Sequence, residues 1–568
     1  MRGKPAHDLA LVICVLLIGF FFSLIIANTA NIPNGDDLYC LMLFTQQFKD
    51  ASTFYERFVL LTQQWVEHRI VYSRFSALLS YWLTGNVNFI TIALIGNLTL
   101  VAFTILFWKV IRKLGASLYF LIPVVLILFS PVTYEGNLWA GASTVYMPVA
   151  FLGLLTVYLL ACNRESGIAW PLFTALLATF SFGNGMFVLL VGLVLLIYQK
   201  RFRIAFIWGL ASVAAIGLYF MNFFSASSTD AFGFSAHFRK PMYLLYNFFA
   251  FIGGILDYSE NINSPFVSAN IPATLLGVTL FAAISYGSLI FLKDTSRPDG
   301  EPGRRNIQYA WLGMAAFLLV TALVMAYSRT AGAAMTTLSS RYKIYSMLFW
   351  IIVYWGCLIY FERKKLVGLV FGIMSLVILV LGYYSYYEKF SNFKSNFIAG
   401  LFNYKNNGEW VIYRHTAFYE GASKMLSDSM AANPDPVFVF HQVFPQLTRK
   451  ALEEAPVLEQ VEISESENCQ GFQGKCLDVR TDEYPSVGNH FEGIYVVVYD
   501  EANIYLFAAR PQRNGRYNMV VDGEYFKKGF LLQENFGNVL KKGNEYKLAV
   551  FCPTAKEQVR RIRYRLEG

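Results

Sequence analysis

Two adjacent carboxylates, Asp36 and Asp37, lie in the segment 31–39, directly after the first long apolar run of the chain. A carboxylate can accept a proton from a hydroxyl nucleophile, and a neighbouring like charge or partial burial raises its pKa toward that task. The sequence Asn34-Gly35-Asp36-Asp37 is also ordinary turn and helix-capping chemistry. The dipeptide alone therefore leaves two interpretations open, a general base and a solvated turn.

The segment 54–82 contains further polar residues that could bind a substrate. Its apolar residues recur at spacings of four and three. This periodicity predicts one long amphipathic helix lying along the membrane surface. His68 falls on the apolar stripe, where a packed histidine is the alternative to a sugar contact. Glu67 and Arg74 share a face, so they either pair with each other or contact substrate. Arg69 and Arg74 are candidates for binding a phosphate group.

A second basic cluster combines Arg329, Arg341 and Lys343 in one predicted outer loop. Basic residues there run against the positive-inside bias of membrane proteins. Guanidinium groups bind phosphate in a two-pronged geometry, so the cluster is a candidate phosphate site. The alternative is that these side chains snorkel to lipid headgroups or cap the next helix.

Four more residues are candidate contacts for a sugar or an acceptor: Glu135, Trp139, Tyr146 and Tyr342. For the aromatic residues, anchoring in the interfacial belt of the membrane is the alternative. Cys469 and Cys476 flank a Gly-rich loop in the predicted exported domain, where either a disulfide or two free thiols would fit. A zinc pair is disfavoured, because no second Cys or His pair lies at finger-like spacing.

Motifs for bound cofactors do not occur in the sequence. It has no Gly-Lys-Ser/Thr phosphate loop, no dinucleotide-binding Gly-rich turn and no His-Glu-x-x-His zinc helix. A nucleotide-driven pump is therefore not expected. No cofactor is expected to be required, because Asp36 and Asp37 alone are thin support for a divalent cation.

The composition indicates the elements that must position these residues. The chain has 568 residues, of which 55% are hydrophobic and 15% charged. Apolar runs near the length of a bilayer crossing recur up to about residue 387. We expect a polytopic α-helical membrane protein of about eleven spans, near 9–27, 88–110, 116–130, 145–162, 168–182, 186–199, 204–224, 267–292, 307–327, 344–361 and 366–387.

The charge distribution predicts the topology. Lys and Arg residues cluster in every second loop between apolar runs, as the positive-inside rule requires, and not in a stripe that would suit nucleic acid. The first run is too long for a signal peptide, so we expect a retained span with a cytoplasmic N-terminus. The segment 29–87 and the residues after 388 then lie outside the cytoplasm.

The C-terminal segment 388–568 turns polar and punctuated, which predicts a separate extracytoplasmic α+β domain rich in strands. The module 1–387 would be the membrane part, with the outer loop and surface helices at 29–87. In the C-terminal domain a helix is expected over 409–432, and strands are expected over 436–440, 493–499, 504–509, 518–521 and 546–551.

Four short stretches together resemble the GT-C class of membrane glycosyltransferases, especially the bacterial O-antigen glucosyltransferases of serotype conversion and their uncharacterised relatives. All four fall where a predicted span ends on the outer side. They are Gly35-Asp36-Asp37-Leu38-Tyr39, Glu135–Ala142 with Tyr146-Met147-Pro148, Ser181-Phe182-Gly183-Asn184-Gly185, and Ser339-Ser340-Arg341-Tyr342. Leu38 stands where the family often has an aromatic residue.

This resemblance implies a bacterial inner-membrane enzyme that moves a sugar from a polyprenyl-phosphate donor to a cell-envelope glycan or glycolipid, with inversion. Asp36 or Asp37 would be the general base. Membrane lipids are expected partners and nucleic acid is not. A lipid-linked sugar transporter or flippase and an O-antigen polymerase or ligase are the alternatives, the first weakened because the unusual charges cluster at the outer ends of spans.

Overall fold

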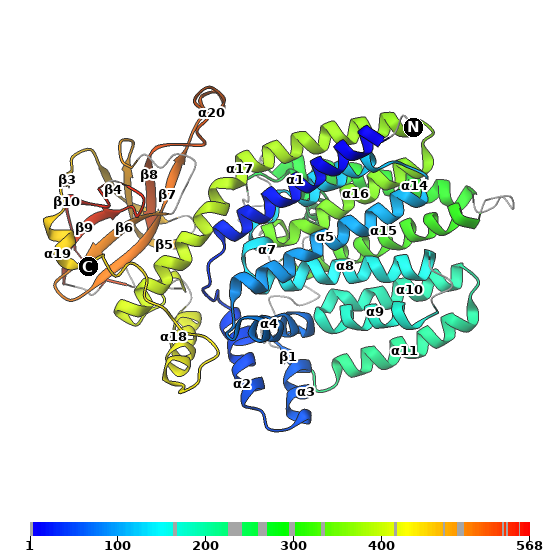
Figure 1. Cartoon of the computed structure of the whole chain (residues 1–568), viewed down its shortest axis with the longest axis horizontal. Helices are drawn as coiled ribbons and strands as arrows, with labels where there is room; N and C mark the ends of the chain where they lie inside the picture. Colours follow the sequence, from blue (N-terminus) through cyan, green and yellow to red (C-terminus); the bar gives the residue numbers. More distant parts are fainter. Residues whose placement is uncertain are drawn as a thin grey trace. The chain divides into compact units, whose positions relative to one another are not determined.

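The chain forms two compact units in the computed structural model (Figure 1). The structure describes residues 4–162, 167–224, 241–259, 270–294, 302–330, 336–413, 417–469, 472–485, 493–536, 539–540, 543–555 and 557–567. The first unit, called the membrane unit here, comprises Met1–Ala27, Gln47–Leu83 and Ile90–Tyr386. The second, called the sheet unit, comprises Asn28–Gln46, Thr84–Phe89 and Tyr387–Gly568.

Apolar helices dominate the membrane unit. Within the described residues, nine helical segments are long and apolar enough to cross a bilayer. They belong to α1 (Lys4–Asn28), α5 (Phe89–Lys113), α6 (Ile122–Leu128) with α7 (Tyr134–Leu138), α8 (Ala140–Cys162), α11 (Phe202–Phe220), α14 (Ile271–Asp294), α15 (Pro302–Arg329), α16 (Lys343–Tyr360) and α17 (Lys364–Asn407). The chain is a multi-pass helical membrane protein, as the sequence predicts.

Three shorter apolar helices complete the bundle: α9 (Ala169–Ser181), α10 (Phe187–Tyr198) and α13 (Pro241–Gly253). The two predicted spans at 168–182 and 186–199 are the short pair α9 and α10. At 1.5 Å per residue these reach only about 20 Å, less than a hydrocarbon core of about 30 Å. The helix α13 lies between the predicted spans 204–224 and 267–292, where the sequence predicts no span.

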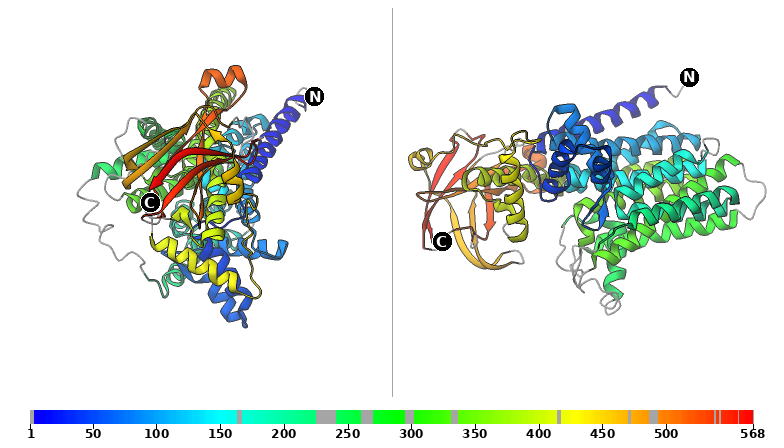
Figure 2. Two further views of the ribbon diagram at one scale, coloured as in Figure 1. Left: turned by 90° about the vertical axis from the view of Figure 1, so that its left-hand side faces the viewer. Right: turned by 90° about the horizontal axis from the view of Figure 1, so that it is seen from below.

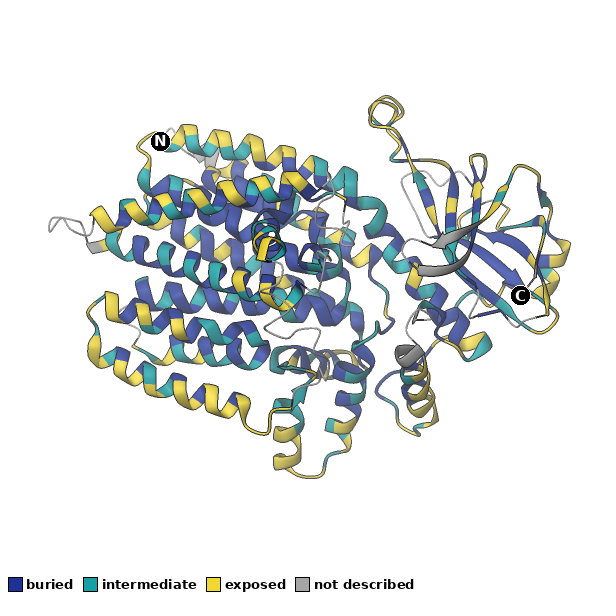
Figure 3. Ribbon diagram, turned by 180° about the vertical axis from the view of Figure 1, so that it is seen from behind, coloured by how far each residue is buried: buried dark blue, intermediate teal, exposed yellow. Residues whose placement is uncertain are grey.

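Exposed residues lie along the outer sides of the bundle helices, and buried residues fill the interior (Figure 3). The helix α16 is buried along almost its whole length, whereas α11 and α17 expose large apolar side chains such as Phe206, Val213, Leu369 and Ile373. Such exposure is unfavourable in water and is the ordinary state of a helix that faces lipid. The burial pattern therefore agrees with a membrane location.

The predicted surface helix over 54–82 is wrong as a single element. The chain instead forms α3 (Phe54–Thr62), a two-stranded hairpin of β1 (Gln64–Trp65) and β2 (His68–Arg69), and α4 (Val71–Thr84). Val66 takes a left-handed φ of 50° at the hairpin turn, which a helix excludes. The shorter α2 (Phe44–Asp50) precedes this segment.

The sheet unit is built on one curved, eight-stranded sheet (Figure 2). The strand order is β3-β10-β9-β6-β7-β8-β5-β4, antiparallel except where β3 pairs with β10. Its strands are β3 (Val457–Leu458), β4 (Glu462–Cys469), β5 (Phe472–Thr481), β6 (Ile494–Tyr499), β7 (Ile504–Arg513), β8 (Phe526–Glu534), β9 (Glu545–Phe551) and β10 (Val559–Glu567). Its helices are α18 (Ala417–Ala432), α19 (Arg449–Glu454) and α20 (Arg516–Asp522).

A β-rich C-terminal region is confirmed, but two of the five strand predictions are wrong. Residues 518–521 lie in the helix α20, which Gly523 ends with a φ of 68°. Residues 436–440 join no ladder, because the Val437 N–H donates to Gln46 Oε1 and its carbonyl accepts from Val87 N. The helix expected over 409–432 is limited to α18, with a single 3₁₀ turn at Val411–Tyr413.

Candidate functional site

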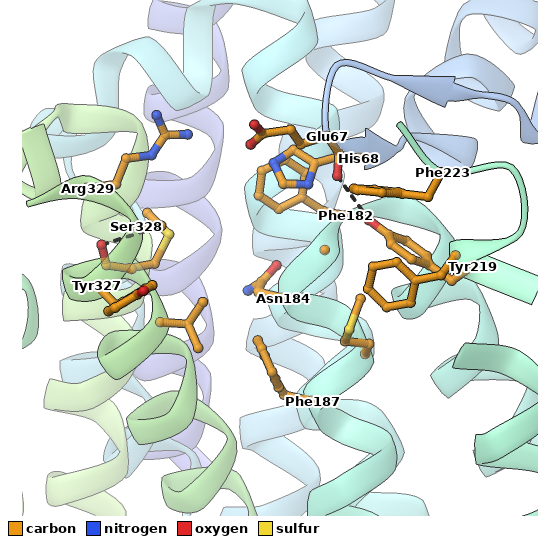
Figure 4. Close-up of a pocket in the computed structure, with 15 residues that line it drawn as sticks. Glu67, His68, Phe182, Asn184, Phe187, Tyr219, Phe223, Tyr327, Ser328 and Arg329 are labelled. Carbon is orange, nitrogen blue, oxygen red and sulfur yellow. Dashed lines mark hydrogen bonds between the residues drawn. The ribbon is translucent and has the colours of Figure 1, made fainter. Parts of the chain in front are cut away.

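A cavity of about 440 Å³ lies within the membrane unit (Figure 4). Its walls are the hairpin β1–β2, the last residues of α11 and the last turns of α15, and its floor is the short turn between α9 and α10. The lining residues are Glu67, His68, Phe182, Gly183, Asn184, Met186, Phe187, Tyr219, Phe220, Phe223, Val324, Met325, Tyr327, Ser328 and Arg329. Because α9 and α10 are shorter than α11 and α15, the floor is recessed below the ends of the wall helices.

Arg69 fastens the hairpin to the end of α11. Its Nε and Nη2 donate to the carbonyls of Tyr219 and Met221, each at 2.9 Å, and its Nη1 donates to Thr62 O. Gln64 supports the same contact, since its Nε2 lies 2.6 Å from Phe224 O. Because helix C-termini leave carbonyls unpaired, Arg69 acts here as a cap. A role in phosphate binding would require it to leave these partners.

Arg74 is also committed to the protein's own backbone. It is buried on α4, and its Nη1 donates to the carbonyls of Gln63, at 2.5 Å, and Leu61, at 3.3 Å. These carbonyls end the helix α3, so Arg74 caps α3 and holds it against α4. The predicted pairing of Glu67 with Arg74 does not occur, because Glu67 lies at the hairpin turn and lines the cavity.

His68 is held neutral at the cavity wall. Its ring packs against Phe182 with centroids 3.9 Å apart, and its buried Nδ1 has no hydrogen-bond partner among the described residues. Burial, and then the positive charge of Arg329, lower the pKa of His68 to about 4, against a smaller raising effect of Glu67. At neutral pH the imidazole can therefore donate or accept a hydrogen bond without carrying charge.

Gly183 makes the close packing at His68 feasible. A methyl group added at Gly183 would lie 3.0 Å from His68 Nδ1 and 3.4 Å from Tyr219 Oη. Asn184, the next residue, donates from Nδ2 to Tyr345 Oη at 2.8 Å and so anchors the cavity floor to α16. In the stretch 181–185, Gly183 thus leaves room for the His68 ring, and the Asn184 side chain is held by its hydrogen bond to Tyr345.

A line of aromatic rings connects the cavity to the second basic cluster. Tyr146 lies edge-on to Phe182 at 5.3 Å and to Tyr342 at 5.0 Å. The Tyr342 ring is approached by two guanidinium groups, Arg329 at 5.8 Å and Arg341 at 5.2 Å. Cation–π contacts of this kind hold a positive charge in place without neutralising it. Both arginines therefore keep their charge for an anion.

The loop that carries Arg341 is anchored to the start of α7. The Arg341 N–H donates to Glu135 Oε2 at 3.4 Å, and the Glu135 N–H donates to Ser340 Oγ at 3.0 Å. The Arg341 guanidinium also lies 5.6 Å from the Trp139 ring. Three of the four sequence stretches that suggested a transferase are therefore adjacent in the membrane unit.

Lys343 lies apart from this group. It is buried and forms an ion pair with Asp257, with Nζ 3.1 Å from Oδ2. Its Nζ also donates to Asp257 O at 3.0 Å and to Tyr386 Oη. The charge of Lys343 is thus matched inside the protein, and the structure does not bring it to the cavity.

The acidic pair belongs to the sheet unit. Asp37 is buried and its Oδ2 accepts the Asn34 N–H at 3.1 Å, closing a tight turn in which Gly35 has a φ of 48°. Asp36 is half-exposed, and its carbonyl accepts the Cys40 N–H at 2.9 Å at the start of a π-helix, Leu38–Leu43. The two carboxylates thus occupy different environments, with Asp36 the more accessible.

The turn is tied to other parts of the sheet unit. Asn31 Oδ1 accepts the Phe89 N–H at 2.9 Å, and the Phe89 ring lies edge-on to Phe438 at 5.3 Å. The Val437 N–H donates to Gln46 Oε1 at 2.9 Å. A segment that follows the first membrane helix is therefore part of the C-terminal unit.

Cysteine and metal chemistry add little to the site. Cys476 is disulfide-bonded, whereas the side chains of Cys14, Cys40, Cys162, Cys357 and Cys552 are thiols. The side chain of Cys469, its predicted partner, lies outside the described residues. The described residues contain no cluster of three or more His, Cys, Asp or Glu side chains placed to hold a metal ion.

The cavity residues that sequence reasoning missed are mostly aromatic or small: Phe182, Gly183, Tyr219, Phe223 and Tyr327. Phe182 and Gly183 lie in a stretch already singled out, so its position at the turn between two spans was a usable signal. The other three sit at helix ends, where aromatic residues are common in any membrane protein. No family model, curated protein or solved structure matches the chain.

Proposed function

We propose that the protein is an inverting membrane glycosyltransferase that takes a sugar from a polyprenyl-phosphate donor and passes it to a cell-envelope glycan or glycolipid. The observation that carries the proposal is the pair Arg329 and Arg341, whose guanidinium groups lie 5.8 Å and 5.2 Å from the Tyr342 ring, with Arg329 at the wall of a recessed cavity. Two fixed cations at the end of membrane helices suit the phosphate of a lipid-linked donor.

The cavity supports the proposal through its lining. It combines aromatic faces, which stack on sugar rings, with a few polar groups that can fix hydroxyls. The neutral His68 and the anchored Asn184 would supply those hydrogen bonds. The Glu67 carboxylate has no hydrogen bond or ion pair in the described part of the chain, so it is available to a ligand.

The reaction would be a single displacement. An acceptor hydroxyl attacks the anomeric carbon, the bond from that carbon to the phosphate oxygen breaks, and the lipid phosphate leaves with the electron pair. A carboxylate accepts the hydroxyl proton. Asp36 or Asp37 is the base that the resemblance implies, and Glu67 is a further candidate because it lines the cavity.

The proposed topology follows the same reasoning. The N-terminus would be cytoplasmic, and the sheet unit would be extracytoplasmic in a bacterial inner membrane. Support comes from basic residues at the ends of spans, including Arg112, Lys113, Lys200 and Lys364.

Sugar transfer from synthetic polyprenyl-phosphate sugars to candidate acceptors tests the proposal. The purified wild type would be compared with Asp36→Asn, Asp37→Asn and Glu67→Gln. We expect transfer by the wild type and its loss in the variant that lacks the base, with unchanged thermal unfolding. Wild-type protein that transfers no sugar but moves a fluorescent lipid-linked sugar across a liposome bilayer would be a flippase instead.

A further inference from the structure

The hairpin formed by β7, α20 and β8 carries an apolar tip. In α20 no residue is buried, and the exposed fractions of Tyr517, Val520 and Val521 are 79%, 79% and 63%. The neck of the hairpin is closed by the Asn514 N–H, which donates to Tyr525 O at 2.8 Å. The tip is thus a helical turn that stands out from the sheet (Figure 1), and its large apolar side chains are exposed.

The base of this hairpin is attached to α17 where that helix leaves its apolar stretch. The Tyr387 ring lies edge-on to Tyr525 at 5.0 Å, and the Glu388 N–H donates to Tyr525 Oη at 3.3 Å. Tyr525 follows α20 by only three residues. Before this point α17 exposes apolar residues as far as Val380. Tyrosines gather at membrane–water interfaces, so the position of Tyr387 just after the apolar stretch is typical of a residue at the level of the lipid headgroups.

Charge on the hairpin also fits a lipid surface. Between residues 513 and 528 the basic residues are Arg513, Arg516, Lys527 and Lys528, against the acidic residues Asp522 and Glu524. Of these, Lys527 lies 3.6 Å from the Asp482 carboxylate. Apolar side chains surrounded by an excess of positive charge are typical of segments that bind anionic lipids at the membrane interface.

The other end of β7 has the opposite character. The turn between β6 and β7 contains Asp500 and Glu501, and its exposed residues are Glu501 and Ala502. Since β7 runs from Ile504 to Arg513, the two ends are about 30 Å apart at 3.3 Å per residue. The base of the β7–β8 hairpin thus contacts the start of the polar part of α17, whereas the other end of β7 is hydrogen-bonded to Asn403 and Asn407 farther along that helix.

We propose that the β7–β8 hairpin docks the sheet unit onto the membrane by inserting Tyr517, Val520 and Val521 into the headgroup region of the leaflet from which α17 emerges. The basic residues at its neck contact anionic phospholipid headgroups. This inference is independent of the transferase proposal, because it concerns the lipid surface and not a substrate.

Spin labels on the full-length protein in lipid nanodiscs test the docking. Single cysteines would be introduced as Val520→Cys and, as the matched control, Glu501→Cys, with Cys162→Ala and Cys357→Ala removing the half-buried thiols. We expect the label at 520 to collide several-fold more often with oxygen than with a water-soluble nickel chelate, relative to the label at 501. Equal ratios at the two sites would overturn the proposal.

The lipid composition tests the role of charge. Nanodiscs containing phosphatidylglycerol would be compared with nanodiscs of phosphatidylcholine alone, which carry no net charge. Deeper insertion of the label at 520 in the anionic nanodiscs supports contact between the basic neck and headgroups. Equal depth in both would overturn the electrostatic part. A label at 520 that is shielded only after a second protein is added would assign the tip to a protein partner.

Discussion

Opposite charges in the membrane unit are arranged in two contrasting ways. Lys343 and Asp257 form a buried ion pair at 3.1 Å, completed by Tyr386. Glu67 and Arg329 line the cavity, and the structure records no ion pair between them in the residues it describes. The first pair is fully matched within the protein, whereas the second pair leaves both charges facing an open space (Figure 4).

This difference separates residues that maintain the fold from residues that can serve a ligand. A buried charge must find its partner inside the chain, because removal from solvent is costly. A charge at a cavity wall keeps access to solvent and can exchange water for a bound group. The comparison predicts that changes at Lys343 act on stability and changes at Arg329 act on binding and turnover.

The largest effect is expected at the buried pair. Lys343→Met leaves the Asp257 carboxylate buried without a counter-charge, which should destabilise the protein by roughly 3–5 kcal/mol. Thermal unfolding of the purified protein in detergent measures the loss. The double variant Lys343→Met with Asp257→Leu should recover most of it, since neither charge remains. A single variant as stable as the wild type would contradict the structural role of Lys343.

The next effect concerns pH and His68. The folded-state pKa of about 4 lies below the ordinary value of 6.5, so the unfolded chain binds more protons between these values. Stability should therefore fall as the pH drops through this window, by about 3 kcal/mol in total. His68→Gln should remove this contribution, so that unfolding midpoints measured from neutral pH to about pH 4 decline less steeply. Identical slopes for both proteins would refute the shifted pKa.

A change at Arg329 is expected to affect the rate of sugar transfer and not the stability of the fold. Arg329→Gln should lower sugar transfer by about 100-fold, since one preorganised charge opposite the leaving phosphate is lost, and should leave thermal unfolding unchanged. Arg329→Lys should retain part of the activity. The Gln variant should also raise the pKa of His68, because the charge of Arg329 helps to lower it. Undiminished transfer would remove Arg329 from the phosphate site.

The smallest effect is expected at an exposed pair in the sheet unit. Lys450 and Glu454 lie 4.0 Å apart with side chains 82% and 68% exposed. Lys450→Ala should change the free energy of unfolding by less than about 0.5 kcal/mol, because solvent screens the pair. Denaturant unfolding measures this change. A loss much larger than about 0.5 kcal/mol would contradict the view that burial distinguishes the Lys343–Asp257 pair from the Lys450–Glu454 pair.

The sequence predicts the fold well where the signal is long. Every span predicted from an apolar run coincides with a described helix. In lipid the backbone must satisfy its own hydrogen bonds, so a long apolar run in a membrane is constrained to be helical. The signal fails for short elements. The apolar spacing within 54–82 fits a helix equally well, and only the cluster of polar residues at 63–69 distinguishes the hairpin. The helix α13, with 13 residues, falls below the length expected of a span.

The candidate site was predictable in part. Glu67, His68 and Arg329 were named from the sequence, and the structure brings them to one cavity. Lys343 was grouped with Arg341 because they are neighbours in sequence. In a helical turn, residues two apart point in nearly opposite directions, so one reaches Trp139 and the other reaches Asp257. Sequence proximity carries no information about such a divergence.

The short helices α9 and α10 have an electrical consequence. They leave only about 20 Å of protein beneath the cavity floor, so in a polarised membrane most of the voltage falls across that thinner layer. An anion that descends past Arg329 to the cavity floor at Asn184 has then passed through part of the field, and a full crossing changes its energy by about 2.3 kcal/mol per charge for each 100 mV. Occupancy of the cavity by a charged ligand would depend on membrane potential as well as on concentration.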